Sequence, residues 1–340
     1  MLKFYQALQR YGLRMRLVRL EGGAPVLEVG YSRILFDSAW GTGVRCISHA
    51  HMDHAGSPGS VNLMTGETMR IFASRRKYYK KFIESTLGVK ISILEGATIT
   101  ALNSGHMLGS SLFNVEADGL SVVYTGDMNV YDSILQKGAE QLEGDVLILE
   151  ATYGSPVYKF PERERIYYEI VKWVSKTLAQ GEIPAFKAYT AGKAQELVAL
   201  INSTVQTPVV VGPEVFSVSR VYKNTYPWMD FLRKGSREGD EALKGGAVYI
   251  SPTIDTQTLH GRRLRWALVT GWTLTHRQEG FSAYFPLSAH SDFFGLVSYA
   301  KNSDYKTVLT IYGYSPVLAR HLRRLGLKAY ALEEKMQIRL

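Results

Sequence analysis

Three histidines and one aspartate lie within six residues of the segment SHAHMDHAGS, and their side chains suit metal-ion chemistry. His49, His51, Asp53 and His54 form the pattern HxHxDH. Imidazole nitrogens and carboxylate oxygens are ligands of zinc, and manganese and iron accept them as well. Residues two apart point the same way at the end of a strand, so His49 and His51 can hold one ion. Asp53 and His54, beyond the turn, can face a second ion.

Three further candidate ligands follow apolar segments and have small neighbours. His106 lies in NSGHMLGSS, Asp127 in VVYTGDMN and His290 in PLSAHSD. A single loop histidine is more often structural than a ligand, but together these residues could complete a site for two ions. Two adjacent divalent cations can supply hydroxide near neutral pH and stabilise charge on a phosphoryl oxygen. The sequence therefore predicts hydrolysis without a serine or cysteine nucleophile.

The apolar pattern predicts the elements that must bring these residues together. Short apolar runs separated by glycine turns in the first 40 residues indicate an antiparallel meander, and a following strand should end at the first histidines. We expect a strand over residues 69–74 and a basic helix over residues 74–85. From about residue 161 helical and strand patterns alternate. These elements predict an α/β or α+β fold built in layers.

The composition is that of a globular protein. The chain has 340 residues, of which 46% are hydrophobic and 21% charged, enough for one large domain or two ordinary ones. Its single cysteine, Cys46, excludes an internal disulfide and a cysteine-rich zinc site. We find no membrane-length apolar stretch and no secretory signal, so we expect a cytoplasmic protein without membrane contact. The net charge of +9 favours a polyanionic partner such as nucleic acid.

With these motifs the sequence resembles the metallo-β-lactamase fold, in which HxHxDH is followed by a separate His, Asp and His. The resemblance implies two Zn²⁺ ions, with Mn²⁺ as the alternative, that share Asp127 as a bridging ligand. It implies that the first ion is held by His49, His51 and His106, and the second by Asp53, His54 and His290. Asp37, in ILFDSA, matches the aspartate that supports the ligand loop; a strand-end turn residue is the alternative.

The middle of the chain narrows this resemblance to the β-CASP nucleases. The segments LILEATYGSPVYKF, IPAFKAYTAGKAQELVAL, LVTGWTL and FPLSAHSDF match that family in order and spacing. The resemblance implies a metallo-β-lactamase αββα sandwich (1–160 and 276–340) with an inserted α/β β-CASP cap (161–275). Glu150 matches the acidic motif of the family, and the cap segment of glycine, basic residue and glutamine is matched by Gly192, Lys193 and Gln195. A catalytic role is implied for Asp53, Asp127 and Glu150.

The resemblance also bears on the substrate. The compact length and segments such as AGKAQEL and GYSPVLARHLRRLGLKAYALEE are most similar to exonucleases associated with DNA ligases. This implies an exonuclease in DNA repair or processing, with a ligase- or helicase-type partner. GKAQEL and SAHSD also resemble the RNA 3′-end-processing and RNase J branches, so RNA is the alternative substrate. A thioesterase-like hydrolase and an inactive nucleic-acid-binding subunit are further alternatives, disfavoured by the cap motifs and by the complete ligand set respectively.

Two positions depart from the family pattern. Many β-CASP nucleases have a catalytic histidine shortly before the SAH segment, and here the candidate general acid is His276, with an ordinary loop residue as the alternative. Relatives often read HGY near the C-terminus, where this chain has YGY with Tyr312. Any metal or phosphate contact made by that histidine is therefore not implied for this chain.

Basic residues mark candidate nucleic-acid-binding surfaces. In residues 75–81, positive charges are mixed with tyrosines that can stack on bases, although a solvated helix face is the alternative. A second cluster lies in HGRRLRW. Together with the cap lysine, the candidates are Arg75, Arg76, Lys77, Lys80, Lys81, Lys193, Arg262, Arg263 and Arg265. Binding of this kind should weaken as salt rises.

Overall fold

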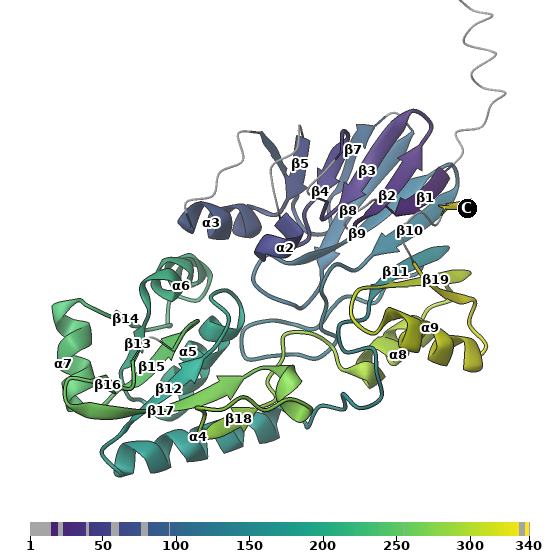
Figure 1. The fold of residues 1–340 in the computed structure, drawn as a ribbon. Helices are drawn as coiled ribbons and strands as arrows, with labels where there is room; N and C mark the ends of the chain where they lie inside the picture. The colour runs from purple at the N-terminus through teal and green to yellow at the C-terminus, as the bar shows by residue number, and fades with distance from the viewer. Residues whose placement is uncertain are drawn as a thin grey trace, which may run out of the picture.

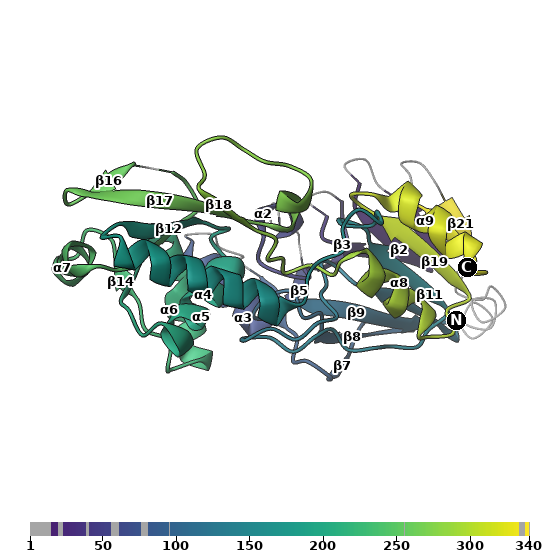
Figure 2. The same ribbon diagram turned by 90° about the horizontal axis from the view of Figure 1, so that it is seen from below.

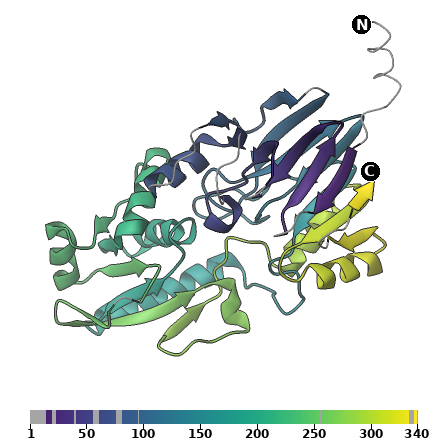
Figure 3. The same cartoon turned by 45° about the horizontal axis from the view of Figure 1, so that its top comes forward.

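The strands of this protein form three sheets. The computed structural model describes residues 15–19, 23–38, 41–55, 61–75, 81–94, 96–254, 256–332 and 337–339. Within these ranges each sheet has seven strands (Figure 1). Two sheets stack face to face, and the third sheet lies to one side with its own helices (Figures 2 and 3).

The first sheet begins with the predicted meander. β1, β2 and β3 pair antiparallel, and β3, β4, β5 and β6 continue as parallel neighbours. The sheet order is β21-β1-β2-β3-β4-β5-β6. The strands are β1 (Met15–Arg19), β2 (Pro25–Val29), β3 (Ser32–Phe36), β4 (Val44–Cys46), β5 (Val61–Met64), β6 (Phe82–Glu84) and β21 (Gln337–Arg339).

The second sheet completes the sandwich, and its strand β11 is buried on both faces. Its order is β20-β19-β11-β10-β9-β8-β7. Its strands are β7 (Lys90–Leu94), β8 (Ala97–Asn103), β9 (Ser111–Ala117), β10 (Leu120–Tyr124), β11 (Val146–Glu150), β19 (Thr307–Ile311) and β20 (Ala329–Ala331). In β11, Val146 and Ile148 join the core between the sheets, whereas Leu147 and Leu149 pack with α8 (Phe293–Lys301) and α9 (Ser315–Arg324). Burial on both faces explains the continuous apolar run VLIL.

The third sheet is parallel apart from the hairpin of β16 and β17. Phe186, Val211 and Ile250 pack against α4, α5 and α6 on one face. Its strands are β12 (Ile183–Lys187), β13 (Val209–Val211), β14 (Leu232–Arg233), β15 (Val248–Ser251), β16 (Thr258–Leu259), β17 (Arg262–Val269) and β18 (Ala283–Phe285). Its helices are α4 (Arg163–Ala179), α5 (Lys193–Thr204), α6 (Pro213–Thr225), α7 (Arg237–Gly245) and the 3₁₀ helix η1 (Gly271–Leu274).

The arrangement confirms the predicted fold class, a sandwich with an inserted α/β cap. We use the name cap for the third sheet and helices α4 to α7. β18, at residues 283–285, pairs with β17 in the third sheet, although the sequence assigned residues after 275 to the sandwich. The domain boundaries stay a prediction. In the described part of the chain, no helix is long and apolar enough to cross a membrane.

Two local predictions are wrong. Residues 69–74, expected as a strand, belong to α3 (Gly66–Ser74), because Thr65 caps the helix by accepting a hydrogen bond from the Thr68 amide. Thr68, Ile71 and Phe72 are buried and have the spacing of one helix face. The prediction of a strand from a short apolar run overlooked this spacing. The helix expected over residues 74–85 is also wrong where the structure describes it, since α3 ends at Ser74 and β6 covers Phe82–Glu84. Residues 76–80 lie outside the described residues.

Candidate metal centre

The HxHxDH segment follows β4 and enters α2 (Met52–Ala55). His49 and His54 are buried, His51 is half-buried, and the Asp53 side chain is 83% exposed. A glycine lets a second loop come close: a Cβ at Gly126 would lie 2.5 Å from the Cβ of Ser48, next to His49. The absence of a side chain at Gly126 therefore allows the following residue, Asp127, to reach the histidines.

Four of the predicted ligands converge, and their spacing fits one divalent cation. Nδ1 of His51 lies 3.0 Å from Nε2 of His49 and 3.2 Å from Nε2 of His106. Oδ2 of Asp127 lies 3.4 Å from Nε2 of His49. Two ligand atoms bound tetrahedrally to zinc at about 2.1 Å would lie about 3.4 Å apart. Burial lowers the pKa of His49 and of His106 well below the usual value, which keeps their lone pairs available for a metal.

The ring nitrogens on the far side of these histidines are held by fixed partners. Nδ1 of His106 donates to the carbonyl of Ala289 at 2.9 Å, and Nε2 of His51 donates to the carbonyl of Ala191 at 3.2 Å. A carbonyl only accepts hydrogen bonds, so it selects the tautomer whose other nitrogen faces the cluster. Such outer contacts orient metal-binding histidines. The Ala191 carbonyl lies within the cap, between β12 and α5, and the Ala289 carbonyl lies in the segment that follows β18.

Asp37 holds a second group. Its Oδ2 accepts hydrogen bonds from Ser48 Oγ at 2.6 Å and Tyr124 Oη at 2.7 Å, and it lies 2.9 Å from Nδ1 of His54. Nε2 of His54 lies 3.5 Å from Oδ1 of Asp127 and 3.9 Å from Oδ2 of Asp53. Although burial opposes it, the carboxylates of Asp127 and Asp37 raise the pKa of His54 to about 10. Asp37 thus fixes the orientation of His54.

His290 approaches Asp127 from a different side. Its Nε2 lies 3.7 Å from Oδ2 of Asp127, whereas His54 is nearer to Oδ1. Its Nδ1 lies 2.9 and 3.1 Å from the two oxygens of Glu150. Glu150 is fully buried at the end of β11. The sequence predicted a ligand group of Asp53, His54 and His290; in the structure Nε2 of His290 faces Asp127, and Glu150 holds its other ring nitrogen.

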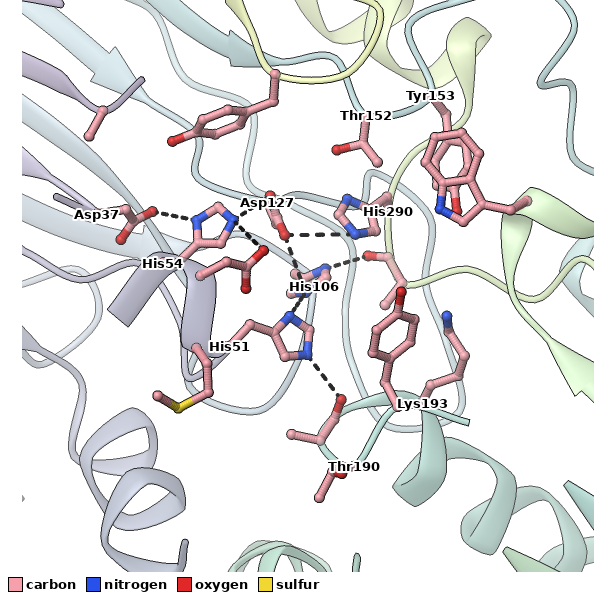
Figure 4. A pocket seen from close by; sticks show the side chains of 18 of the residues that line it. Asp37, His51, His54, His106, Asp127, Thr152, Tyr153, Thr190, Lys193 and His290 are labelled. Atoms are coloured by element: carbon pink, nitrogen blue, oxygen red, sulfur yellow. Dashed lines mark hydrogen bonds and ion pairs between the residues drawn. The ribbon is translucent and has the colours of Figure 1, made fainter. Parts of the chain in front are cut away.

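These residues line a cavity of about 630 Å³ between the sandwich and the cap (Figure 4). The cap side of the wall includes Tyr189, Thr190 and Lys193. Lys193 is buried, which lowers the pKa of its ammonium group to about 8, and its Nζ lies 4.7 Å from the centre of the Tyr189 ring. Tyr312, at a positive φ of 63°, also lines the cavity.

The remaining predicted residues are dispersed. Arg75 lines the cavity. Lys81 is exposed near β6, and Arg76, Lys77 and Lys80 lie outside the described residues. The three arginines of β17 are not among the residues that line the cavity, and the Nε of Arg265 pairs with Glu182 at 2.5 Å. The three are Arg262, Arg263 and Arg265.

His276, predicted as a general acid, is exposed and lies outside the metal-centre cavity. It lines a neighbouring cavity, with its ring 6.3 Å from that of Trp272. Sequence reasoning missed Tyr189 and Trp272, which line both cavities. The segments AYTAGK and TGW contain them, but no spacing rule marks either ring as part of a site.

Several known proteins are similar to this chain. No protein-family model matches it. It is 29% identical over 304 residues to a "Probable DNA ligase" of Opitutus terrae, which covers 86% of this chain and 29% of the relative. It is 25% identical over 262 residues to an "RNase J-like protein" of Methanocaldococcus jannaschii, and the match covers 68% of this chain and 62% of the relative. It is 30% identical over 191 residues to "Cleavage and polyadenylation specificity factor subunit 3" of Dictyostelium discoideum, and the match covers 46% of this chain and 24% of the relative.

The solved structures include a crystal structure of a protein of unknown function from Enterococcus faecalis V583. It aligns with a TM-score of 0.65 at 13% identity, over 96% of this chain and all of that one, which shows a shared fold alone. The chain spans less than two thirds of the length of the three curated relatives.

The sandwich and its histidine-aspartate cluster define a protein of the metallo-β-lactamase fold. The relatives that it matches are metallo-β-lactamase β-CASP nucleases. The predicted resemblance is thereby confirmed. The ligand clusters and the family together indicate the use of a divalent metal ion.

Proposed function

We propose that this chain is a metal-dependent nuclease that hydrolyses phosphodiester bonds in the cavity between sandwich and cap. The observation that carries the proposal is the convergence of ligand atoms from His49, His51, His106 and Asp127, all within 4.8 Å of one another. The similarity to nucleases supports the same reaction. A small-molecule hydrolase lacks comparable support.

The proposed cofactor is a pair of Zn²⁺ ions, with Mn²⁺ as the alternative. The first ion would be held by the converging group, and the second by Asp53 and His54, with Asp127 contributing one oxygen to each. When bound, such ions lower the pKa of a water molecule and stabilise charge on a phosphoryl oxygen. Separate contacts of the two Asp127 oxygens with His49 and His54 support this division.

The chain's own residues supply proton transfer and substrate positioning. Because Glu150 holds Nδ1 of His290, the Nε2 atom of His290 points toward Asp127 and can deliver a proton to the leaving oxygen. This role replaces the one predicted for His276. A metal-ligand role for His290, as the sequence predicted, is the alternative. On the cap side, Lys193 can contact a phosphate of the substrate, and Arg75 offers a second positive charge.

We assign the substrate to DNA, cut from an end, as the first candidate. The match to the Opitutus terrae relative, which spans 86% of this chain and carries the name of a DNA ligase, supports DNA repair or processing. A ligase- or helicase-type partner is part of the same proposal. RNA is the second candidate, supported by the RNase J-like and cleavage-factor relatives. The basic net charge of +9 suits either polyanion.

The test is a cleavage assay with end-labelled single-stranded DNA and RNA of the same sequence, in the presence of zinc or manganese. We expect a ladder of products shortened stepwise, with DNA cut faster than RNA, and no products after chelation with EDTA. A faster reaction with RNA would reverse the substrate assignment. Hydrolysis of thioesters without any nucleic-acid cleavage would contradict the proposed function.

A further inference from the structure

A second cavity, which we call the side pocket, adjoins the metal-centre cavity. It has a volume of about 650 Å³, within the range of small-molecule sites. Tyr189, Thr190 and Trp272 line both cavities, so one ligand can extend from one into the other. The side pocket lies where β12 and β17 end, at the carboxyl edge of the parallel sheet. Open parallel sheets bind ligands at this edge.

Aromatic rings form the walls of the side pocket. Tyr189, which is 58% exposed, lines it together with Trp272 and Tyr314, whose ring centres lie 6.4 Å apart. Trp272 is held from behind, because its ring lies 4.7 Å from that of Tyr153 and 5.3 Å from that of Tyr158. The Trp272 ring is therefore supported by packing before any ligand arrives. Flat, supported rings of this kind are suited to stacking on nucleobases.

The packing of Trp272 against these rings requires a glycine at the preceding position, residue 271. A Cβ at Gly271 would lie 2.6 Å from Cζ of Phe160 and 2.7 Å from the hydroxyl of Tyr153. The close approach fixes the turn that presents the indole to the side pocket.

The polar groups that line the side pocket can form hydrogen bonds with the edge of a base, and the part of its lining that the structure describes carries no acidic side chain. His276 and Gln278 offer both donors and acceptors of hydrogen bonds, and Lys187 adds a positive charge. Among the described residues that line the side pocket, none is an aspartate or glutamate. An anionic nucleotide therefore meets no like charge on these walls.

The side pocket is linked to the metal ligands through a short segment of backbone. Tyr189 and Thr190 immediately precede Ala191, whose carbonyl accepts a hydrogen bond from His51 at 3.2 Å. The ring at residue 189 and the ligand His51 therefore keep a fixed relation, with ring centres 6.2 Å apart. A nucleotide whose phosphate lies at the metal centre would have its base close to this ring.

We propose that the side pocket binds the base of the nucleotide next to the scissile phosphodiester, by stacking on Tyr189 and Trp272. The proposal rests on the proposed nuclease function and adds a recognition site for the base. It assigns Tyr189, Trp272, His276 and Gln278 to substrate binding. His276 accordingly contacts the base edge and takes no part in proton transfer.

A binding experiment tests the proposal without catalysis. Metal-free protein in EDTA is titrated with adenosine 5′-monophosphate and with ribose 5-phosphate, which lacks the base, by calorimetry. We expect the nucleotide to bind about 10-fold more tightly, a typical effect of stacking on an aromatic side chain. Tyr189→Ala and Trp272→Leu should each remove most of this difference. The matched control is Trp228→Ala, since Trp228 is a half-exposed cap residue that lines neither cavity. Equal binding of the two ligands, or no binding of the nucleotide, would overturn the proposal.

A cleavage experiment separates this proposal from the proposed function. Oligonucleotides with an abasic residue at either end are compared with intact ones. We expect kcat/KM of the wild-type protein to fall about 10-fold for the abasic residue at the end where cleavage begins, and Tyr189→Ala to be nearly indifferent to it. Equal rates on abasic and intact substrates would refute the base site alone. Failure to cut any oligonucleotide would instead refute the nuclease function.

Discussion

Nδ1 of His290 lies 2.9 Å from Oε1 of Glu150, although the two residues are 140 positions apart in the sequence. Glu150 also accepts hydrogen bonds from the amides of Met128 at 2.8 Å and Thr152 at 3.2 Å. Burial opposes ionisation, but His290 and these hydrogen bonds lower the pKa of Glu150 below its usual value. A charged carboxylate therefore fixes the histidine ring, and the opposite nitrogen is directed toward Asp127.

The first prediction concerns His290. We expect His290→Ala to lower kcat by about 100- to 10,000-fold, because a positioned general acid contributes that much. The metal content, measured by mass spectrometry of the purified protein, should stay that of the wild type. Glu150→Gln should lower kcat less than His290→Ala does, since the histidine remains but loses its charged partner. Loss of a metal ion from His290→Ala would show that His290 is a ligand instead.

The second prediction concerns Asp53, whose side chain is exposed and contributes little packing. Asp53→Asn should lower the cleavage rate by at least about 100-fold, because the carboxylate is proposed to hold the second ion. Nucleic-acid binding, measured by fluorescence anisotropy, should persist, and the thermal midpoint should not change in EDTA. A variant that cleaves at the wild-type rate would rule out the proposed site.

The third prediction concerns Asp37, which is buried and holds Ser48, His54 and Tyr124. Asp37→Ala should reduce the free energy of unfolding by about 2 to 4 kcal/mol, because several buried hydrogen bonds to a charged group are lost together. Metal affinity should fall about 10- to 100-fold. The control is Tyr124→Phe, which removes one donor and keeps the carboxylate, so the loss should be about 1 kcal/mol. Urea denaturation would measure the free energy of unfolding of both variants. Equal losses in Asp37→Ala and Tyr124→Phe would contradict the central position of Asp37.

The fourth prediction uses the buried Lys193. Burial lowers its pKa from 10.5 to about 8, so the folded protein releases this proton more readily than the unfolded chain does. Below pH 8 the charge destabilises the fold, and the cost disappears as the pH rises from about 8 to 10.5. Lys193→Met should therefore raise the free energy of unfolding at pH 7, by up to about 3 kcal/mol.

This stabilisation should shrink above pH 8 and be accompanied by weaker substrate binding, because the proposed phosphate contact is lost. Denaturant titrations of both proteins at pH 7 and pH 10 would measure the change. A variant that is less stable than the wild type at pH 7 would contradict the assigned effect of burial.

The local part of the site could be predicted from the sequence, because it depends on short spacing. His49, His51, Asp53 and His54 are near neighbours, and strand geometry alone suggests how two of them face one ion. Their convergence with His106 could only be inferred from the family resemblance, since it depends on strands that pair far along the chain. The structure places Nε2 of His106 3.2 Å from Nδ1 of His51.

The partners beyond the ligands could not be predicted. The carbonyls of Ala191 and Ala289 orient His51 and His106, but backbone acceptors leave no mark on the sequence. The α3 helix was missed because the short run MRIFAS fits a strand as well as a helix, and the signals of a helix, the Thr65 cap and the spacing of Thr68, Ile71 and Phe72, begin before that run. Elements whose apolar residues recur with a regular spacing were predicted correctly, as in α4 (Arg163–Ala179).

The central claim is that two divalent ions lie side by side on this cluster. Anomalous X-ray scattering at the zinc absorption edge, from crystals grown with zinc, measures it directly. We predict two adjacent peaks, one against His49, His51 and His106 and the other against Asp53 and His54, with Asp127 between them. Crystals in which zinc is bound elsewhere, and these imidazoles are turned away from one another, would contradict it.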